Sequence, residues 1–90
     1  MDVAGRFGEN LARCRRRADL SQEELGVLAA MNRTQIGILE RGERLPRIDT
    51  LARLAGALSV SPDELLEGIS WRPGTVTPGS FELSHAEDEG

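Results

Sequence analysis

Apolar residues recur at intervals of three or four along the first part of the chain, and this spacing is typical of amphipathic helices. One series predicts a helix over about residues 4–18 and consists of Val3, Phe7, Leu11, Cys14 and Ala18. Another predicts a helix over about residues 48–58 and consists of Ile48, Leu51, Leu54, Ala55 and Leu58. No alternating strand pattern occurs before residue 69. The pattern therefore predicts an all-α fold for residues 1–68.

Capping signals add two short helices between these. Ser21 is followed three residues later by Glu24, and Asn32 is followed at the same distance by Gln35. Both pairs match the capping box, in which side chains satisfy the free amides of a helix start. We expect one helix from Ser21 to about residue 30 and the next over about residues 33–41.

Other signals define the ends and buried faces of the short helices. Leu25 and Leu28 would form the buried face of the helix that follows Ser21. Gly42 supplies the left-handed residue that commonly closes a helix. Ser61 would cap a fifth helix over about residues 62–68, with Pro62 at its first position. The helix over about residues 48–58 follows an arginine and has no good cap.

The charge of the chain is unevenly distributed. Residues 1–68 hold ten arginines against eleven acidic residues, whereas residues 69–90 hold one arginine against four. The net charge of −4 therefore comes mainly from the C-terminal part. The arginines form two groups, Arg13, Arg15, Arg16 and Arg17 and then Arg33, Arg41, Arg44 and Arg47. Such clusters favour nucleic-acid binding more than the net charge opposes it.

The composition excludes several classes of protein. A chain of 90 residues forms one small domain, and it contains no apolar run long enough to span a membrane. Its N-terminus lacks a secretory signal, so we expect a cytoplasmic protein. Cys14 and His85 cannot supply a disulfide or a usual zinc site. Without a catalytic triad or a glycine-rich phosphate loop, the sequence predicts a non-enzyme that uses no cofactor or metal.

Residues 69–90 form a non-helical C-terminal tail that contains two prolines and two of the three aromatic residues. We expect a short β-hairpin between Thr75–Thr77 and Phe81–Leu83. Trp71, Phe81 and Leu83 are candidates for contact with a second copy or another protein, because exposed aromatic residues anchor interfaces. The alternative is that the tail folds back over the first and fifth helices.

The motifs along about residues 9–68 together resemble one known family. These motifs are Leu20-Ser21-Gln22-Glu23-Glu24-Leu25, Ile36, Leu39-Glu40-Arg41-Gly42-Glu43-Arg44, Pro46, Leu51, Leu54-Ala55, Leu58 and Val60-Ser61-Pro62-Asp63-Glu64-Leu65-Leu66. The set is similar to the phage repressor and Cro-type helix-turn-helix family, also called the xenobiotic response element family. The resemblance implies a compact five-helix lambda-repressor-like domain that binds double-stranded operator DNA, as a transcriptional regulator or repressor, and acts as a homodimer.

The face of the helix over about residues 33–41 predicts how DNA would be read. Ile36 and Leu39 are expected to point inward, which leaves Arg33, Thr34 and Ile38 on the outer face together with Gly37 and Arg41. Arginine can donate two hydrogen bonds to guanine, threonine can donate or accept, and isoleucine can pack on a thymine methyl group. Gly37 would let the helix approach the groove closely.

The resemblance also implies contacts to the DNA backbone. Gln22 matches the family's phosphate-binding glutamine, although capping is its simpler role. Arg41 and Arg44 match positions along the sugar-phosphate backbone. Arg15 matches an arginine that pairs with a glutamate corresponding to Glu40, and it is a further candidate for phosphate contact.

The chain departs from the family's pattern at several positions. Ala30 and Asp19 stand where glycine is usual, and Gly26 stands where alanine is usual. Glu43 replaces a common lysine and places a negative charge near the expected phosphate track.

Two rival functions remain. An antitoxin would also bind DNA, and residues 69–90 would bind its toxin. A protein-interaction adaptor would keep the fold and use its exposed faces for proteins, so its binding would lack the salt dependence that counterion release gives to DNA binding.

Overall fold

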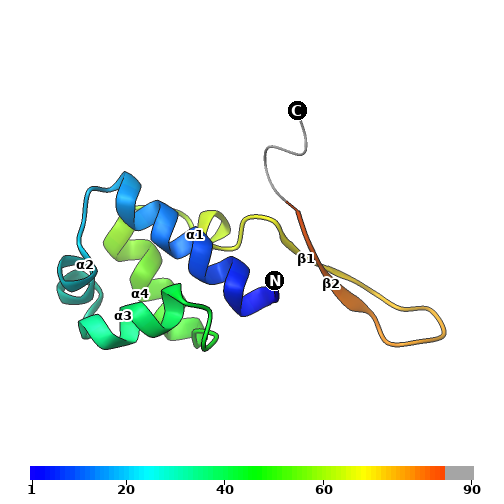
Figure 1. Ribbon diagram of the computed structural model, residues 1–90. Coiled ribbons are helices and arrows are strands. Elements are labelled where there is room, and N and C mark those ends of the chain that lie inside the picture. The colour runs from blue at the N-terminus through cyan, green and yellow to red at the C-terminus, as the bar shows by residue number, and fades with distance from the viewer. Residues whose placement is uncertain (85–90) are drawn as a thin grey trace.

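The computed structural model describes residues 1–84 and consists of a helical body followed by a β-hairpin (Figure 1). The predicted five helices are confirmed, and the described elements are α1 (Val3–Arg17), α2 (Gln22–Ala29), α3 (Arg33–Glu40), α4 (Ile48–Leu58), α5 (Pro62–Leu65), β1 (Ile69–Arg72) and β2 (Ser80–Leu83). No helix within residues 1–84 combines the length and the apolar character that crossing a membrane requires.

The helix starts largely follow the capping signals of the sequence. Complete capping boxes begin α2 at Ser21 and α3 at Asn32. Arg47 leaves the start of α4 without a side-chain cap, as predicted. The expected cap at Ser61 is wrong, because its side chain makes no capping hydrogen bond, and α5 ends at Leu65. With a single turn and no side-chain cap, α5 relies on packing for its stability.

The core lies between the helices and is built from their predicted apolar stripes. Its buried residues are Phe7, Leu11, Cys14, Leu25, Ala29, Ile36, Leu39, Leu54, Ala55, Leu58 and Leu65. Two predictions are wrong, since Leu28 is 59% exposed and Ile48 is 84% exposed. In α2 the buried stripe runs through Leu25 and Ala29, four residues apart, and Leu28 falls beside it.

Three turns bend through left-handed backbone at residues other than glycine. Asp19, Ala30 and Ser59 have φ angles of 61°, 58° and 56°. Asp19 and Ala30, where the resemblance implies glycine, thus adopt a backbone conformation that glycine favours. A left-handed residue other than glycine costs about 1–2 kcal/mol, which packing of the flanking helices offsets.

α1 crosses the end of α3 in close contact. A Cβ atom at Gly8 would lie 2.5 Å from the carbonyl oxygens of Leu39 and Glu40. After α3, Gly42 has the predicted left-handed conformation, with φ of 73°, and a Cβ atom there would lie 2.7 Å from the Cα atom of Gly5. Backbone contact with α1 therefore holds the C-terminal end of α3 in place.

One of the two predicted strands is confirmed, because Phe81–Leu83 lies within β2, and the other is wrong. Ile69–Arg72 pairs with Ser80–Leu83 in antiparallel register, so Trp71 faces Phe81. The predicted strand Thr75–Thr77 lies in the connecting loop instead. The observed register places Ile69, Trp71, Phe81 and Leu83 on one face, because alternate residues of a strand share a face. Pairing through Thr75–Thr77 would have separated these apolar residues.

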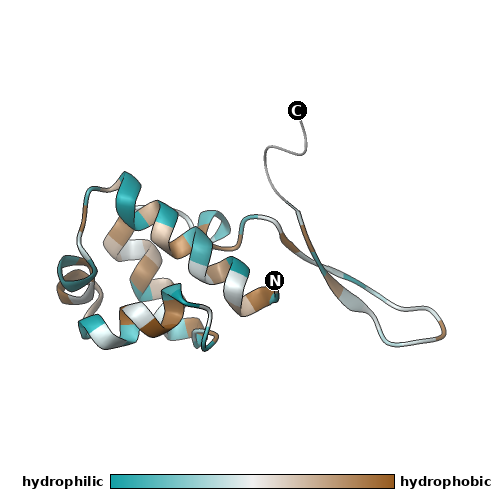
Figure 2. Cartoon of the chain, in the orientation of Figure 1, coloured by the Kyte–Doolittle hydropathy of each residue, from teal (hydrophilic) through white to brown (hydrophobic). Residues whose placement is uncertain are grey.

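The hairpin projects away from the helical body (Figure 1). Apolar residues within the body lie mainly on the inner sides of the helices, whereas the hairpin shows apolar stretches along an element that stands apart (Figure 2). Its base is attached to the body by a hydrogen bond from Arg6 to the carbonyl oxygen of Ser84. Asn10 Nδ2 also donates to the carbonyl oxygens of Leu65 and Glu67, each at 2.9 Å.

Candidate nucleic-acid interface

α3 presents one side to the core and another to solvent, in the orientation that the sequence predicts. Ile36 is fully buried and Leu39 is 4% exposed. Arg33 and Thr34 are exposed, and Ile38 is half-buried. An exposed polar face with one partly accessible apolar residue can make both hydrogen bonds and methyl contacts.

Gly37 lies under other side chains, which corrects its predicted place on the open face. A Cβ atom at this position would lie 2.9 Å from Arg41 Nη1 and 3.9 Å from Gln22 Nε2. The missing side chain therefore makes room for the Arg41 guanidinium beside α2. The role of this glycine in accommodating DNA would be indirect.

A buried network joins α1, α2 and α3. Arg15 Nε donates to Glu40 Oε2 at 2.6 Å, and Arg15 Nη2 donates to Glu40 Oε1 at 3.0 Å. The side chains are only 13% and 7% exposed. Arg15 Nη1 also donates to the carbonyl oxygen of Leu20 at 2.9 Å. The pair fixes the end of α3 relative to α1 and to the turn before α2.

The electrostatics of this network favour its charged state. The hydrogen bond with Glu40, opposed by partial burial, raises the pKa of Arg15 above its usual value. Arginine is already protonated at all physiological pH values, so this shift does not change the charge of Arg15.

Gln22 belongs to the same network. Its Nε2 donates to Glu40 Oε1 at 3.0 Å, and its side chain is not the cap of α2, since Ser21 is. An amide nitrogen carries two hydrogens, so one donor of Gln22 is left for another acceptor. The simpler role of helix capping, which the sequence left open for Gln22, is therefore wrong.

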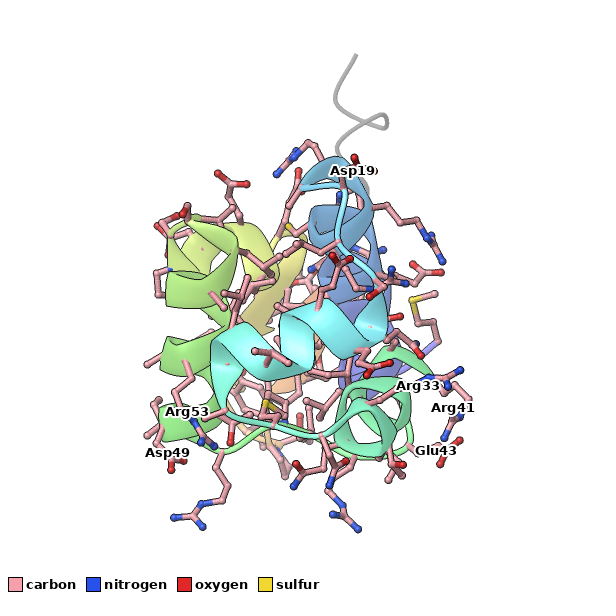
Figure 3. All side chains as sticks on the ribbon, turned by 90° about the vertical axis from the view of Figure 1, so that its left-hand side faces the viewer. Asp19, Arg33, Arg41, Glu43, Asp49 and Arg53 are labelled. Carbon is pink, nitrogen blue, oxygen red and sulfur yellow. The ribbon has the colours of Figure 1, made fainter. Side chains whose placement is uncertain are left out.

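The remaining arginines of the candidate site are exposed. Figure 3 shows Arg33, Arg41 and Glu43 on one side of the view and Asp49 with Arg53 on the other. Arg41 Nε donates to Glu43 Oε2 at 2.5 Å. Within residues 1–84, Arg33 and Arg44 make no ion pair. Their guanidinium groups are therefore open to an anionic ligand.

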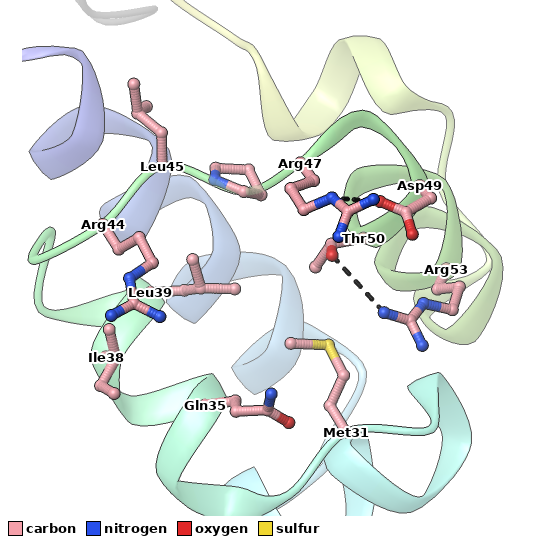
Figure 4. A pocket seen from close by; sticks show the side chains of 11 residues that line it. Met31, Gln35, Ile38, Leu39, Arg44, Leu45, Arg47, Asp49, Thr50 and Arg53 are labelled. Atoms are coloured by element: carbon pink, nitrogen blue, oxygen red, sulfur yellow. Dashed lines mark hydrogen bonds and ion pairs between the residues drawn. The ribbon is translucent and has the colours of Figure 1, made fainter.

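An open groove of about 240 Å³ separates the end of α3 from the start of α4. Its walls include Ile38, Arg44, Arg47 and Arg53, and Figure 4 shows the Arg44 guanidinium next to Ile38. Sequence reasoning missed Arg53. The three-residue spacing from Thr50 to Arg53 places them on one helix face, and their hydrogen bond measures 3.5 Å.

The groove also contains the start of α4. Arg47 provides no side-chain cap, so the first amides of an 11-residue helix lack a side-chain acceptor. Free amides and the helix dipole favour an anion at such a position. Arg47 pairs with Asp49 at 3.5 Å, but both side chains are mostly exposed.

The three tail residues that the sequence singled out come together on the hairpin. Trp71 and Phe81 are 53% and 57% exposed. Their rings lie edge to face, with centroids 5.0 Å apart. Leu83 is half-buried near the base. The hairpin and α3 are separate features of the molecule (Figure 1), so contacts at one would leave the other free.

Comparisons with known proteins agree with this geometry. A helix-turn-helix domain model matches residues 6–67. An uncharacterised HTH-type transcriptional regulator, y4dJ of Sinorhizobium fredii, is 42% identical and the match covers 73% of this chain and 86% of that protein. The control protein C.SmaI of Serratia marcescens is 41% identical over 73% of this chain and 79% of its own length.

Solved structures give the same result for the arrangement in space. The restriction-modification controller protein C.AhdI of Aeromonas hydrophila has a TM-score of 0.67 and 37% identity, with coverage of 69% of this chain and 94% of that one. The P22 c2 repressor, solved in complex with a synthetic operator, has a TM-score of 0.64 and 34% identity at the same coverages.

Proposed function

This chain belongs to the helix-turn-helix family of DNA-binding transcriptional regulators, and on that premise we propose that it binds its operator by placing α3 in the major groove. Its body has the lambda-repressor-like fold. The observation that carries the proposal is the outward face of α3, where Thr34 is exposed and Ile38 is partly accessible.

The proposed readers of base edges are Arg33, Thr34 and Ile38. Arg33 is at the first turn of α3, exposed and without an ion pair among residues 1–84, so it can reach either guanine or a phosphate. Thr34 can bond to several bases, and Ile38 would contact a thymine methyl group. These three residues would set the preferred sequence.

The proposed phosphate contacts flank this face. Arg41 and the free amide hydrogen of Gln22 lie on the α2 side, and Arg44 lies on the groove side. Arg47 and Arg53 extend the groove side, where the open start of α4 adds its amides. Arg15 would act mainly by positioning Glu40, because its guanidinium is engaged within the body.

Selection of bound sequences from a random duplex pool by the full chain tests this function. We expect enrichment of one motif, with Thr34→Ala relaxing the preference at particular bases. Arg44→Ala should instead weaken binding to all sequences and reduce the slope of log affinity against log salt by about one. Arg72→Ala, which removes an arginine of the hairpin, is the control and should leave both unchanged. No enrichment and a flat salt dependence would favour the adaptor.

The hairpin supports the second part of the proposal, a homodimer. Two-fold dimers of such domains bind half-sites roughly 34 Å apart, which requires a contact between copies outside α3. The apolar face of the hairpin offers one, because Trp71 and Phe81 are more than half exposed there. Co-purification of a different protein through this face would instead favour the antitoxin.

A further inference from the structure

Arg41 and Glu43 occupy fixed backbone positions at the end of α3. The Gly8 and Gly42 contacts described above pack this end against α1. Two hydrogen bonds close the turn, from the amide of Gly42 to the carbonyl oxygen of Leu39 and from the amide of Glu43 to that of Ile38, each at 3.1 Å. The backbone therefore fixes the positions of the two Cα atoms and keeps the two side chains within reach of each other.

The Arg41 guanidinium is also directed by its surroundings. Its Nη1 lies over Gly37, on the side of α2 that carries Gln22. Its Nε is occupied by Glu43 Oε2 at 2.5 Å. A phosphate bound to arginine would use the same donors, since carboxylate and phosphate oxygens are equivalent acceptors for a guanidinium.

We propose that Glu43 is an internal competitor of the DNA backbone: it holds the Arg41 guanidinium in the free protein, and operator binding requires that this pair separate. The inference rests on the proposed function, since it concerns the same phosphate track. Glu43 thereby sets the affinity of the regulator below the value that its arginines would otherwise give.

The exposure of the pair is consistent with competition rather than with a structural lock. The two side chains are 59% and 54% exposed, so their mutual attraction is weak and a phosphate can displace the carboxylate. The hydrogen bond from Arg41 lowers the pKa of Glu43, so the carboxylate is charged at neutral pH. By contrast, the Arg15–Glu40 pair is enclosed and not available for exchange.

Glu43→Gln is the direct test, with the operator obtained from the selection as the probe. Removing the charge releases Arg41 and ends the repulsion between Glu43 and phosphate. We expect affinity to rise about tenfold at low salt. The slope of log affinity against log salt should steepen by up to about 0.9, because the net positive charge that meets the phosphates increases by one.

Two further variants distinguish competition from a general effect of charge and from repulsion alone. Glu82→Gln removes the same charge from the hairpin, where Glu82 pairs with Arg72 at 2.8 Å, and it should leave operator affinity unchanged. Arg41→Ala combined with Glu43→Gln should show a smaller gain over Arg41→Ala than Glu43→Gln shows over the natural chain, because only the part that comes from ending the repulsion remains. Thermal unfolding of each variant reports any structural effect, which competition does not predict.

The outcomes distinguish the two proposals. Operator binding by the natural chain with no gain in Glu43→Gln would overturn the competition and leave the function standing. An equal gain in the Arg41→Ala background would show that Glu43 acts by repulsion alone, which also overturns it. Failure of the natural chain to bind any duplex would instead refute the proposed function.

Discussion

The helical body and the hairpin differ in how far they bury their apolar side chains. In the body, Leu11, Leu25 and Ile36 are fully buried between helices. In the hairpin, Trp71 and Phe81 share one face and remain more than half exposed. A body that is closed on itself can fold alone, whereas an isolated two-stranded hairpin is marginally stable in water. The difference indicates that the body supplies the stability, and it supports the proposal that the hairpin is a contact surface.

The ion pairs of the body and of the hairpin differ in the same way, since one is enclosed and the other is exposed. The enclosed Arg15–Glu40 pair joins two helices of the body. The Arg72–Glu82 pair of the hairpin is 71% and 48% exposed and lies on the face opposite the aromatic rings. Enclosed pairs are costly to break because the remaining partner is left without water, and exposed pairs contribute little.

Breaking the enclosed pair should have the largest effect. Glu40→Ala leaves the Arg15 guanidinium without its carboxylate, and we expect it to reduce the free energy of unfolding by about 3–5 kcal/mol. Denaturant unfolding followed by circular dichroism measures this. Operator affinity should fall as well, because the end of α3 is no longer fixed.

Arg13→Ala is the matched control for that prediction. Arg13 pairs with Glu67 at 2.7 Å, but both side chains are nearly half exposed. Its loss should cost no more than about 1 kcal/mol. Equal stability changes for Glu40→Ala and Arg13→Ala would contradict the distinction between enclosed and exposed pairs.

Filling the contact between α1 and α3 should have an intermediate effect. Gly8→Ala places a methyl group against the backbone of Leu39 and Glu40, which cannot move as a side chain can. We expect a loss of about 1–3 kcal/mol, measured as a lower midpoint of thermal unfolding. Gly56→Ala, in α4, should instead stabilise by about 0.5–1 kcal/mol, because a Cβ atom there would meet no other described part of the chain within 4 Å.

Removing an aromatic ring from the hairpin should have the smallest effect on stability. Trp71→Ala deletes a side chain that packs on Phe81 rather than on the body, so the unfolding free energy should change by less than about 0.5 kcal/mol. Sedimentation equilibrium of the full chain should show dimers for the natural sequence and monomers for this variant. A large loss of stability with unchanged association would reverse the roles that we assign to body and hairpin.

Most of the body could be predicted from the sequence because its signals are local. The capping boxes at Ser21 and Asn32 and the spacing of Ile36 from Leu39 depend on residues within one or two turns. The pairing of Arg15 with Glu40 could not be obtained this way, since 25 residues separate them. It followed from family resemblance, as did the phosphate candidates, whose roles stay predictions.

The errors occur where distant segments decide the outcome. Thr75–Thr77 is a good local strand, yet Ile69–Arg72 pairs with Ser80–Leu83 because that register gathers four apolar residues on one face. Gly37 has the helical position of an exposed residue, and it is covered because the side chains of Arg41 and of the distant Gln22 lie over it. The local sequence pattern cannot predict the strand pairing or the covering of Gly37, because both depend on how segments far apart in the sequence meet.

The sequence by itself determined the helices, their inward faces and the arginine-rich character of the site, because caps and periodicity act over a few residues. Tertiary structure alone decided that the end of α3 is clamped by glycine contacts with α1 and that the groove gathers Arg44 and Arg53. It also decided that the Arg41 guanidinium lies over Gly37 while its Nε bonds to Glu43. These features depend on how closely the helices come to one another, and the packing of the whole core decides this.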